Sequence, residues 1–155
     1  MFKPIRTIAG IAAVAAVAGT AAAGTAATST ADAARSCHYW EIPSSFVINQ
    51  PRNGWTVKTR GKPVDFKWQV SAYPYPRVYT EFGTLKLTRF DTKPSKSKRR
   101  EDWPKVEFTV ALDNGSTGLY TGRIDPDGFI DGTTRDRFNS RAKSDFEVRE
   151  PLDCA

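Results

Sequence analysis

Three aspartates around a glycine are the residues of this sequence whose types and spacing come nearest to a metal site. In the stretch LDNGSTGLYTGRIDPDGFIDGTT, residues 112–134, Asp125, Asp127 and Asp131 flank Gly128 at alternate or nearly alternate positions. Carboxylate oxygens at alternate positions of a glycine-containing loop are ligands that Ca²⁺ prefers. The stretch therefore either binds a cation or only reverses the chain.

The spacing does not fit a calcium loop. An EF-hand loop beginning at Asp125 needs an oxygen ligand at its fifth position and a glycine at its sixth, where this chain has Phe129 and Ile130. A hairpin turn explains the stretch better, because Pro126 presets φ, Asp125 can accept a backbone hydrogen bond and Gly128 tolerates positive φ. We predict a turn here, with no metal and no other cofactor.

The other short motifs also favour structure over chemistry. Asn114-Gly115-Ser116 matches a glycosylation sequon, but a tight turn uses the same residues, and we predict the turn. The single histidine, His38, adjoins a cysteine, and no serine has a nucleophile signature around it. Paired carboxylates drawn from Glu81, Glu107 and Asp131 remain open, since distant strands can bring them together. We assign no catalytic residues and expect a protein that is not an enzyme.

The N-terminus has the composition of a secretory signal peptide. Two basic residues precede an apolar run at residues 8–18, and Ala31-Asp32-Ala33 matches a small-residue cleavage site. We predict a signal peptide at residues 1–33 and a single domain at residues 34–155, with no membrane span after cleavage. An uncleaved anchor is the alternative, but the segment is rich in Ala, Gly and Thr and weakly apolar for a bilayer span.

The two cysteines, Cys37 and Cys154, lie near the two ends of the predicted domain. In an oxidising compartment we expect them to form a disulfide, which would hold the termini side by side. A loop of this size is worth up to about 4.7 kcal/mol in the chain-entropy model. A reactive thiol or a metal pair is the alternative, and neither has supporting residues nearby.

Alternation of polar and apolar residues predicts antiparallel strands. It is clearest in VDFKWQV, KVEFTVAL and SDFEVRE, at residues 64–70, 105–112 and 144–150. Shorter candidate strands lie at residues 45–50, 55–59, 77–82, 84–90, 118–124 and 129–134. Turn residues separate them at 51–54, 60–63, 113–115 and 125–128.

These strands predict an all-β fold, because no segment after the signal has a helical period. We expect a small antiparallel meander that forms a closed or nearly closed β-barrel of about eight strands, with the termini tied by one disulfide. A sandwich is the alternative, and adjacent termini favour the barrel. The longest connection, residues 91–104, is polar and basic, and we expect it to be flexible.

The segment from Val106 onward carries a recurring set of turns and glycine strands. It contains an N-G turn, a G-x-Y-x-G strand, a D-x-D-G turn and a G-T-T strand, here Asn114-Gly115, Gly118 to Gly122, Asp125 to Gly128 and Gly132 to Thr134. This pattern resembles small secreted actinobacterial all-β proteins of uncharacterised function. The resemblance implies a disulfide-tied barrel similar in shape to avidin or lipocalin barrels. The avidin biotin-site residues and the lipocalin G-x-W are missing, so it implies neither of those activities.

Two surface features could meet a partner. The chain has a formal net charge of +6, and its densest basic run is Lys93, Lys96, Lys98, Arg99 and Arg100. This run could bind an anionic polymer or a cell-envelope component. A solvated loop is the alternative, because Glu101 and Asp102 follow at once. Nothing in the sequence predicts specific nucleic-acid binding.

The second feature is aromatic. Tyr73, Tyr75 and Trp103 lie in proline-containing loops and could form one exposed patch, although packing over a barrel mouth would use the same side chains. Alternation instead places Trp55 and Trp68 on the inward face.

We therefore predict a secreted, extracellular, non-enzymatic binding or interaction module of unknown ligand, with its loops and basic run facing the partner. Association with the cell envelope stays open. The inward residues are nearly all apolar, which favours a filled core over a polar pocket. The alternatives are a carrier or small hydrolase with an internal barrel cavity, and a structural envelope protein.

Overall fold

The computed structural model describes residues 37–155. The signal peptide predicted at residues 1–33, with its cleavage site, lies outside the described residues. Within residues 37–155, no helix is long and apolar enough to cross a membrane.

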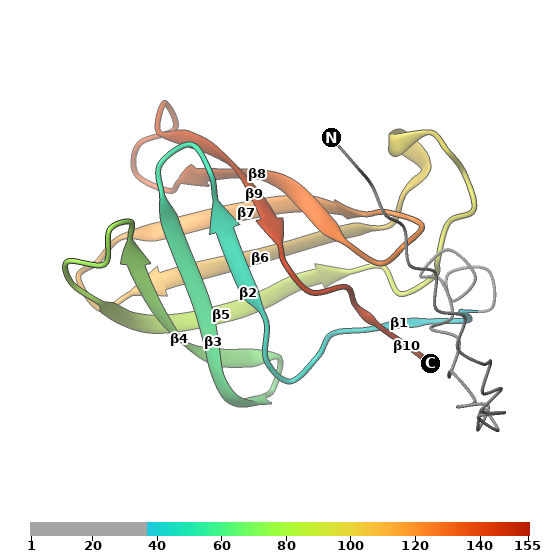
Figure 1. The fold of residues 1–155 in the computed structure, drawn as a ribbon, viewed down its shortest axis with the longest axis horizontal. Coiled ribbons are helices and arrows are strands. Elements are labelled where there is room, and N and C mark those ends of the chain that lie inside the picture. The colour runs from blue at the N-terminus through green and yellow to red at the C-terminus, as the bar shows by residue number, and fades with distance from the viewer. Residues whose placement is uncertain (1–36) are drawn as a thin grey trace, which may run out of the picture.

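Eight antiparallel strands close into a barrel, and each pairs with the next along the chain (Figure 1). They are β2 (Val47–Gln50), β3 (Trp55–Val64), β4 (Lys67–Pro74), β5 (Glu81–Phe90), β6 (Lys105–Leu112), β7 (Thr117–Ile124), β8 (Ile130–Asp136) and β9 (Lys143–Val148). The predicted all-β closed barrel is confirmed. A single 3-10 turn, η1 (Arg100–Asp102), interrupts the long connection between β5 and β6.

The first and last barrel strands meet along a short seam. In register, only Ile48 faces Val148 and Asn49 faces Glu147. Two further hydrogen bonds extend the seam, from the Arg149 N–H to the Val47 carbonyl at 3.0 Å and from the Val47 N–H to a Glu150 carboxylate oxygen at 3.1 Å.

The chain segments on either side of this seam are tied together outside the barrel. β1 (Trp40–Glu41) precedes β2, β10 (Asp153–Cys154) follows β9, and the two pair as a separate antiparallel ribbon (Figure 1). The predicted disulfide between Cys37 and Cys154 is confirmed, with the two Cα atoms 5.3 Å apart.

The up-and-down topology gives the barrel two distinct ends. The disulfide end carries the ribbon of β1 and β10 and the connections at 65–66, 91–104 and 125–129. The open end carries the connections at 51–54, 75–80, 113–116 and 137–142.

The hairpin between β3 and β4 corrects the predicted strand at residues 64–70. The chain reverses at Asp65 and Phe66, which have φ of 49° and 57°, and Val64 pairs with Lys67. Val64 and Phe66 are therefore 72% and 70% exposed instead of facing the core. The turn predicted at residues 60–63 is instead an irregularity within β3, where the register shifts. Two non-glycine residues at positive φ are uncommon, so local turn chemistry pointed to the wrong place.

Two of the predicted strands are one strand in the structure, and several other predicted boundaries shift by a few residues. The candidate strands at residues 77–82 and 84–90 form the single strand β5, which begins at Glu81. Residues 75–80 are a connection at the open end, where the Arg77 guanidinium donates to the Thr80 hydroxyl at 3.2 Å and 3.1 Å.

The disulfide half of the barrel interior is filled with large apolar side chains. Its buried residues include Phe46, Trp68, Leu85, Val106, Ile124, Ile130 and Val148. The void left among them is about 10 Å³, the size of one water molecule at most. β7 and β8 approach so closely here that a Cβ on Gly132 would collide with the Thr121 carbonyl oxygen.

Candidate functional site

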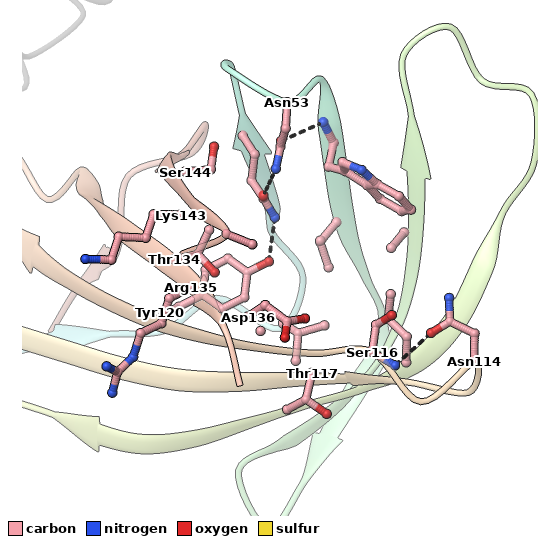
Figure 2. Close-up of a pocket in the computed structure, with 18 of the residues that line it drawn as sticks. Asn53, Asn114, Ser116, Thr117, Tyr120, Thr134, Arg135, Asp136, Lys143 and Ser144 are labelled. Carbon is pink, nitrogen blue, oxygen red and sulfur yellow. Dashed lines mark hydrogen bonds between the residues drawn. The ribbon is translucent and has the colours of Figure 1, made fainter. Parts of the chain in front are cut away.

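The open half of the barrel interior is hollow. A cavity of about 540 Å³ opens between the connections at this end, within the size range of small-molecule sites. We call it the cup. Its lining side chains come from seven of the eight barrel strands, all but β5, and include Gln50, Trp55, Ala72, Tyr120, Thr134 and Ser144 (Figure 2).

The cup exists because small side chains occupy inward positions at the open end. Ala72 on β4, Gly118 on β7 and Ser144 on β9 lie where the disulfide half carries residues such as Trp68, Ile124 and Val148. An eight-stranded barrel is wide enough either to be filled by side chains or to hold one small ligand. The expected filled core is therefore correct for one half of the barrel only.

Three aromatic rings separate the cup from the filled half. The rings of Phe108 and Tyr120 stack with centroids 4.7 Å apart, and both meet the ring of Phe146 edge-on, at 5.5 Å and 5.2 Å. All three side chains are buried. These rings, fixed on β6, β7 and β9, form the base of the cup.

A chain of hydrogen bonds runs from this base to the rim. The Gln50 side-chain amide donates to the Tyr120 hydroxyl at 2.6 Å, and the Asn53 amide donates to the Gln50 carbonyl oxygen at 2.7 Å (Figure 2). Burial raises the pKa of Tyr120 to about 12, although Gln50 and Thr134 act in the opposite direction. The inner polar group of the cup is therefore a neutral hydroxyl near neutral pH.

The mouth of the cup is rich in exposed apolar side chains. Trp55 and Tyr79 meet edge-on at one side, with ring centroids 6.0 Å apart. Tyr75 is 87% exposed on the same connection as Tyr79, and Phe138 is 78% exposed on the connection between β8 and β9. These side chains place exposed apolar surface on the connections of the open end.

Three charged residues border the cup, but only one has an inward position. Asp136 follows Thr134 by two residues on β8 and so shares its inward face, and its Oδ1 accepts the N–H groups of Phe138 and Asn139 at 2.8 Å and 2.7 Å. Arg135 and Lys143 occupy outward positions, and their side chains extend away from the Tyr120 hydroxyl in Figure 2.

The basic run predicted as an anion-binding loop is partly neutralised. The Arg99 guanidinium contacts the Asp102 carboxylate at 3.0 Å, and Arg100 forms a bidentate pair with Asp131 whose longer contact is 2.7 Å. Lys93, Lys96 and Lys98 are exposed, and none forms an ion pair within residues 37–155.

The same connection is extensively hydrogen-bonded. The Trp103 indole donates to the Ser97 carbonyl at 2.9 Å, and the Arg123 guanidinium donates to the carbonyls of Glu101, at 3.1 Å, and Trp103. The first bond lies within the connection, and the two bonds from Arg123 attach Glu101 and Trp103 to β7.

The predicted patch of Tyr73, Tyr75 and Trp103 does not form. Tyr73 and Tyr75 lie at the open end, where Arg77 stacks on the Tyr73 ring at 4.7 Å. Trp103 precedes β6 at the disulfide end, half-buried. The proline-containing loops belong to opposite ends of the up-and-down barrel, which sequence proximity to proline does not reveal.

The aspartate stretch is the turn that its spacing predicts. One Asp125 carboxylate oxygen accepts the N–H groups of Asp127 and Phe129, both at 2.9 Å, and Gly128 has φ of 89°. Burial raises the pKa of Asp125, against those two hydrogen bonds. Asp131 points outward to Arg100. Among residues 37–155, no three His, Cys, Asp or Glu side chains gather in a way that could hold a metal ion.

The sequon stretch is also a turn. The Asn114 side-chain oxygen accepts the Ser116 N–H at 2.9 Å, and Gly115 has φ of 90°. The carboxylates of Glu81, Glu107 and Asp131 do not form a catalytic pair in the barrel interior, since Glu107 and Asp131 occupy outward positions and Glu81 begins β5 at the open end.

Comparisons with protein-family models, with curated proteins and with solved structures returned no match for this chain. The protein is thus defined by its structure alone. It is an eight-stranded antiparallel barrel that is filled at its disulfide end and hollow at the other.

The raised pKa of Tyr120 predicts how stability changes at alkaline pH. Between about pH 10 and pH 12 the unfolded chain loses this proton while the folded protein keeps it, so the free energy of unfolding should fall as the pH rises, by up to about 1.4 kcal/mol per pH unit. Urea unfolding at a series of pH values would measure it. Tyr120→Phe should remove this component, and an identical pH dependence in both proteins would show that Tyr120 is not responsible.

Proposed function

We propose that this protein is a non-enzymatic binding protein that holds a small molecule in the cup. The observation that carries the proposal is a ligand-sized cavity at one end of a barrel whose other end is packed solid. This favours the carrier alternative over a module that binds through its basic loop. The binding site lies within the barrel end, where strands on all sides fix the lining side chains.

The chemistry of the cup supports binding over hydrolysis. Its inner polar groups are the Gln50 amide and the hydroxyls of Tyr120 and Thr134. Tyr120 has a pKa near 12, so it is a poor general base near neutral pH. Apolar walls with a few convergent neutral polar groups are typical of small-molecule sites.

Adjacent threonines on β8 provide a matched test. Thr134 is buried and lines the cup, whereas Thr133 is exposed on the outer wall. The probe is 2-naphthol, a rigid aromatic alcohol, measured by equilibrium dialysis. Thr134→Trp should weaken its binding by about tenfold or more, or ~1.4 kcal/mol, because the indole would occupy the cup. Thr133→Trp should leave the dissociation constant unchanged.

Thr134→Leu fills less of the cup and serves if the tryptophan variant does not fold. It should also weaken naphthol binding, but by less than Thr134→Trp. Absence of naphthol binding to the wild-type protein, or equal effects of the two tryptophan substitutions, would count against the cup as the binding site.

We propose Lys93, Lys96 and Lys98 of the basic run as a second candidate binding site, because Arg99 and Arg100 are paired with carboxylates. These three side chains are exposed on one connection at the disulfide end, far along the barrel from the cup. Closely spaced cations can bind an anionic polymer in a salt-dependent way.

Changing Lys93, Lys96 and Lys98 together to Ser should lower the salt concentration that elutes the protein from a heparin column. The control changes Lys58, Lys67 and Lys86 to Ser, three exposed positions on the barrel wall, and so removes the same total charge. An equal shift for both variants would show that net charge alone retains the protein, and that the connection is not a binding site.

We also propose that the protein is secreted, after cleavage of a signal peptide near Ala33. The composition of residues 1–33, the resemblance to secreted actinobacterial proteins and the disulfide between Cys37 and Cys154 support this. The intact mass of the protein recovered from culture medium would test it, since a mass that includes residues 1–33 would contradict cleavage.

A further inference from the structure

We propose that the cup selects its ligand by charge: it takes an uncharged or cationic molecule with an aromatic or alicyclic body and disfavours anions. This rests on the proposed function and names the class of ligand. It follows from the sign and the position of the charges around the cavity and from the uncharged side chains at the bottom of the cavity.

Asp136 is the one charged residue that both lines the cup and has an inward position; the other inward carboxylate of the open half, Glu81 opposite Ala72 on β5, does not line it. Strand alternation places Asp136 inside, next along the inward face from Thr134, whereas the neighbouring Arg135 and Lys143 fall on the outer wall. The protein as a whole is basic, yet the charged residues at inward positions of this half, Asp136 and Glu81, are both acidic.

The free oxygen of Asp136 is what an entering ligand meets. Oδ1 already accepts two backbone N–H groups, from Phe138 and Asn139. Oδ2 accepts no hydrogen bond from residues 37–155. A carboxylate at the mouth of a partly dehydrated cavity repels an anion more strongly than it would in bulk water, because the effective dielectric constant is lower there.

Deeper in the cup, no group compensates an anion for its lost hydration. The inner donors and acceptors are those of Gln50, Tyr120 and Thr134, all uncharged, and the base is the ring cluster of Phe108, Tyr120 and Phe146. An ion transferred to such an environment without a counter-charge is destabilised, whereas a hydroxyl or carbonyl group can hydrogen-bond there.

The rings and the hydrogen-bond chain together indicate how the ligand is oriented. Its apolar body packs against Trp55, Val57 and Val110 along the wall, and a neutral polar group at its inner end meets the Tyr120 hydroxyl and the Gln50 amide. A cationic group, where the ligand has one, lies at the outer end beside Asp136.

Two probes with the same ring system separate this inference from the proposed function. 2-Naphthol is uncharged at about pH 7 and 2-naphthoate is an anion, and equilibrium dialysis measures the dissociation constant of each. We expect naphthoate to bind the wild-type protein about tenfold more weakly than naphthol, a ratio that corresponds to ~1.4 kcal/mol.

Asp136→Asn tests the cause of this difference. Asparagine keeps the side-chain oxygen that accepts the N–H groups of Phe138 and Asn139, so the connection between β8 and β9 stays capped while the charge is lost. In this variant the dissociation constant of naphthoate should exceed that of naphthol by about threefold or less. The control Asp145→Asn removes a carboxylate from the adjacent strand, where it is exposed and paired with Arg52 on the outer wall, and should leave the ratio unchanged.

Added salt gives a second measurement that needs no variant. Raising the NaCl concentration should lower the ratio of the naphthoate to the naphthol dissociation constant for the wild-type protein, because salt screens the repulsion by Asp136. Equal binding of the two probes to the wild-type protein, or an unchanged ratio in Asp136→Asn, would overturn the charge selection and leave the cup as a binding site. Failure of both probes to bind would overturn the proposed function itself.

Discussion

Closure of the sheet between β2 and β9 is the constraint on which the rest of this structure depends. The seam has only two residue pairs in register, extended by the hydrogen bonds around Val47. The strands that form it are the first and the last of the barrel, so the segments that leave them, β1 and β10, emerge side by side. The disulfide between Cys37 and Cys154 fastens those two segments. A covalent link at this place limits how far the weakest pairing of the barrel can separate, which the same bond elsewhere in the chain would not do.

Closure also fixes the interior width, and the side chains then decide what the interior does. Large residues fill the disulfide half to a residual void of about 10 Å³. Small residues leave about 540 Å³ at the other end. The ring layer of Phe108, Tyr120 and Phe146 divides the two regions and belongs to both, since it completes the packed core on one side and forms the base of the cup on the other. The packed core that stabilises the fold and the cavity that forms the candidate site therefore occupy opposite ends of the barrel.

Particular residues show where sequence reasoning was sufficient and where it was not. Alternation in KVEFTVAL and SDFEVRE gave correct strands with correct inward faces, and the spacing around Gly128 gave a correct turn, because both are properties of neighbouring residues. The hairpin at Asp65 and Phe66 was misplaced, because Gly61 offered a better local turn than the one that forms. The cup was missed for a different reason. Ala72, Gly118 and Ser144 are unremarkable small residues on three separate strands, and a hollow results only when all three face the same end of the interior. All three residues are small and lie near the open-end termini of their strands, and this was the one available sign of the cup in the sequence.

The sequence by itself determined the fold class, most of the strand faces and turns, and the pair of cysteines, since each rests on local periodicity, local conformational preference or a count. Only the tertiary structure decided which side chains meet. It separated Tyr73 and Tyr75 from Trp103 by the length of the barrel, paired Arg99 and Arg100 with carboxylates, and brought Gln50 and Tyr120 to a hydrogen bond across 70 residues of chain. Those outcomes depend on register, strand direction and barrel closure. They are set by the whole sheet at once, and no stretch of the sequence contains them.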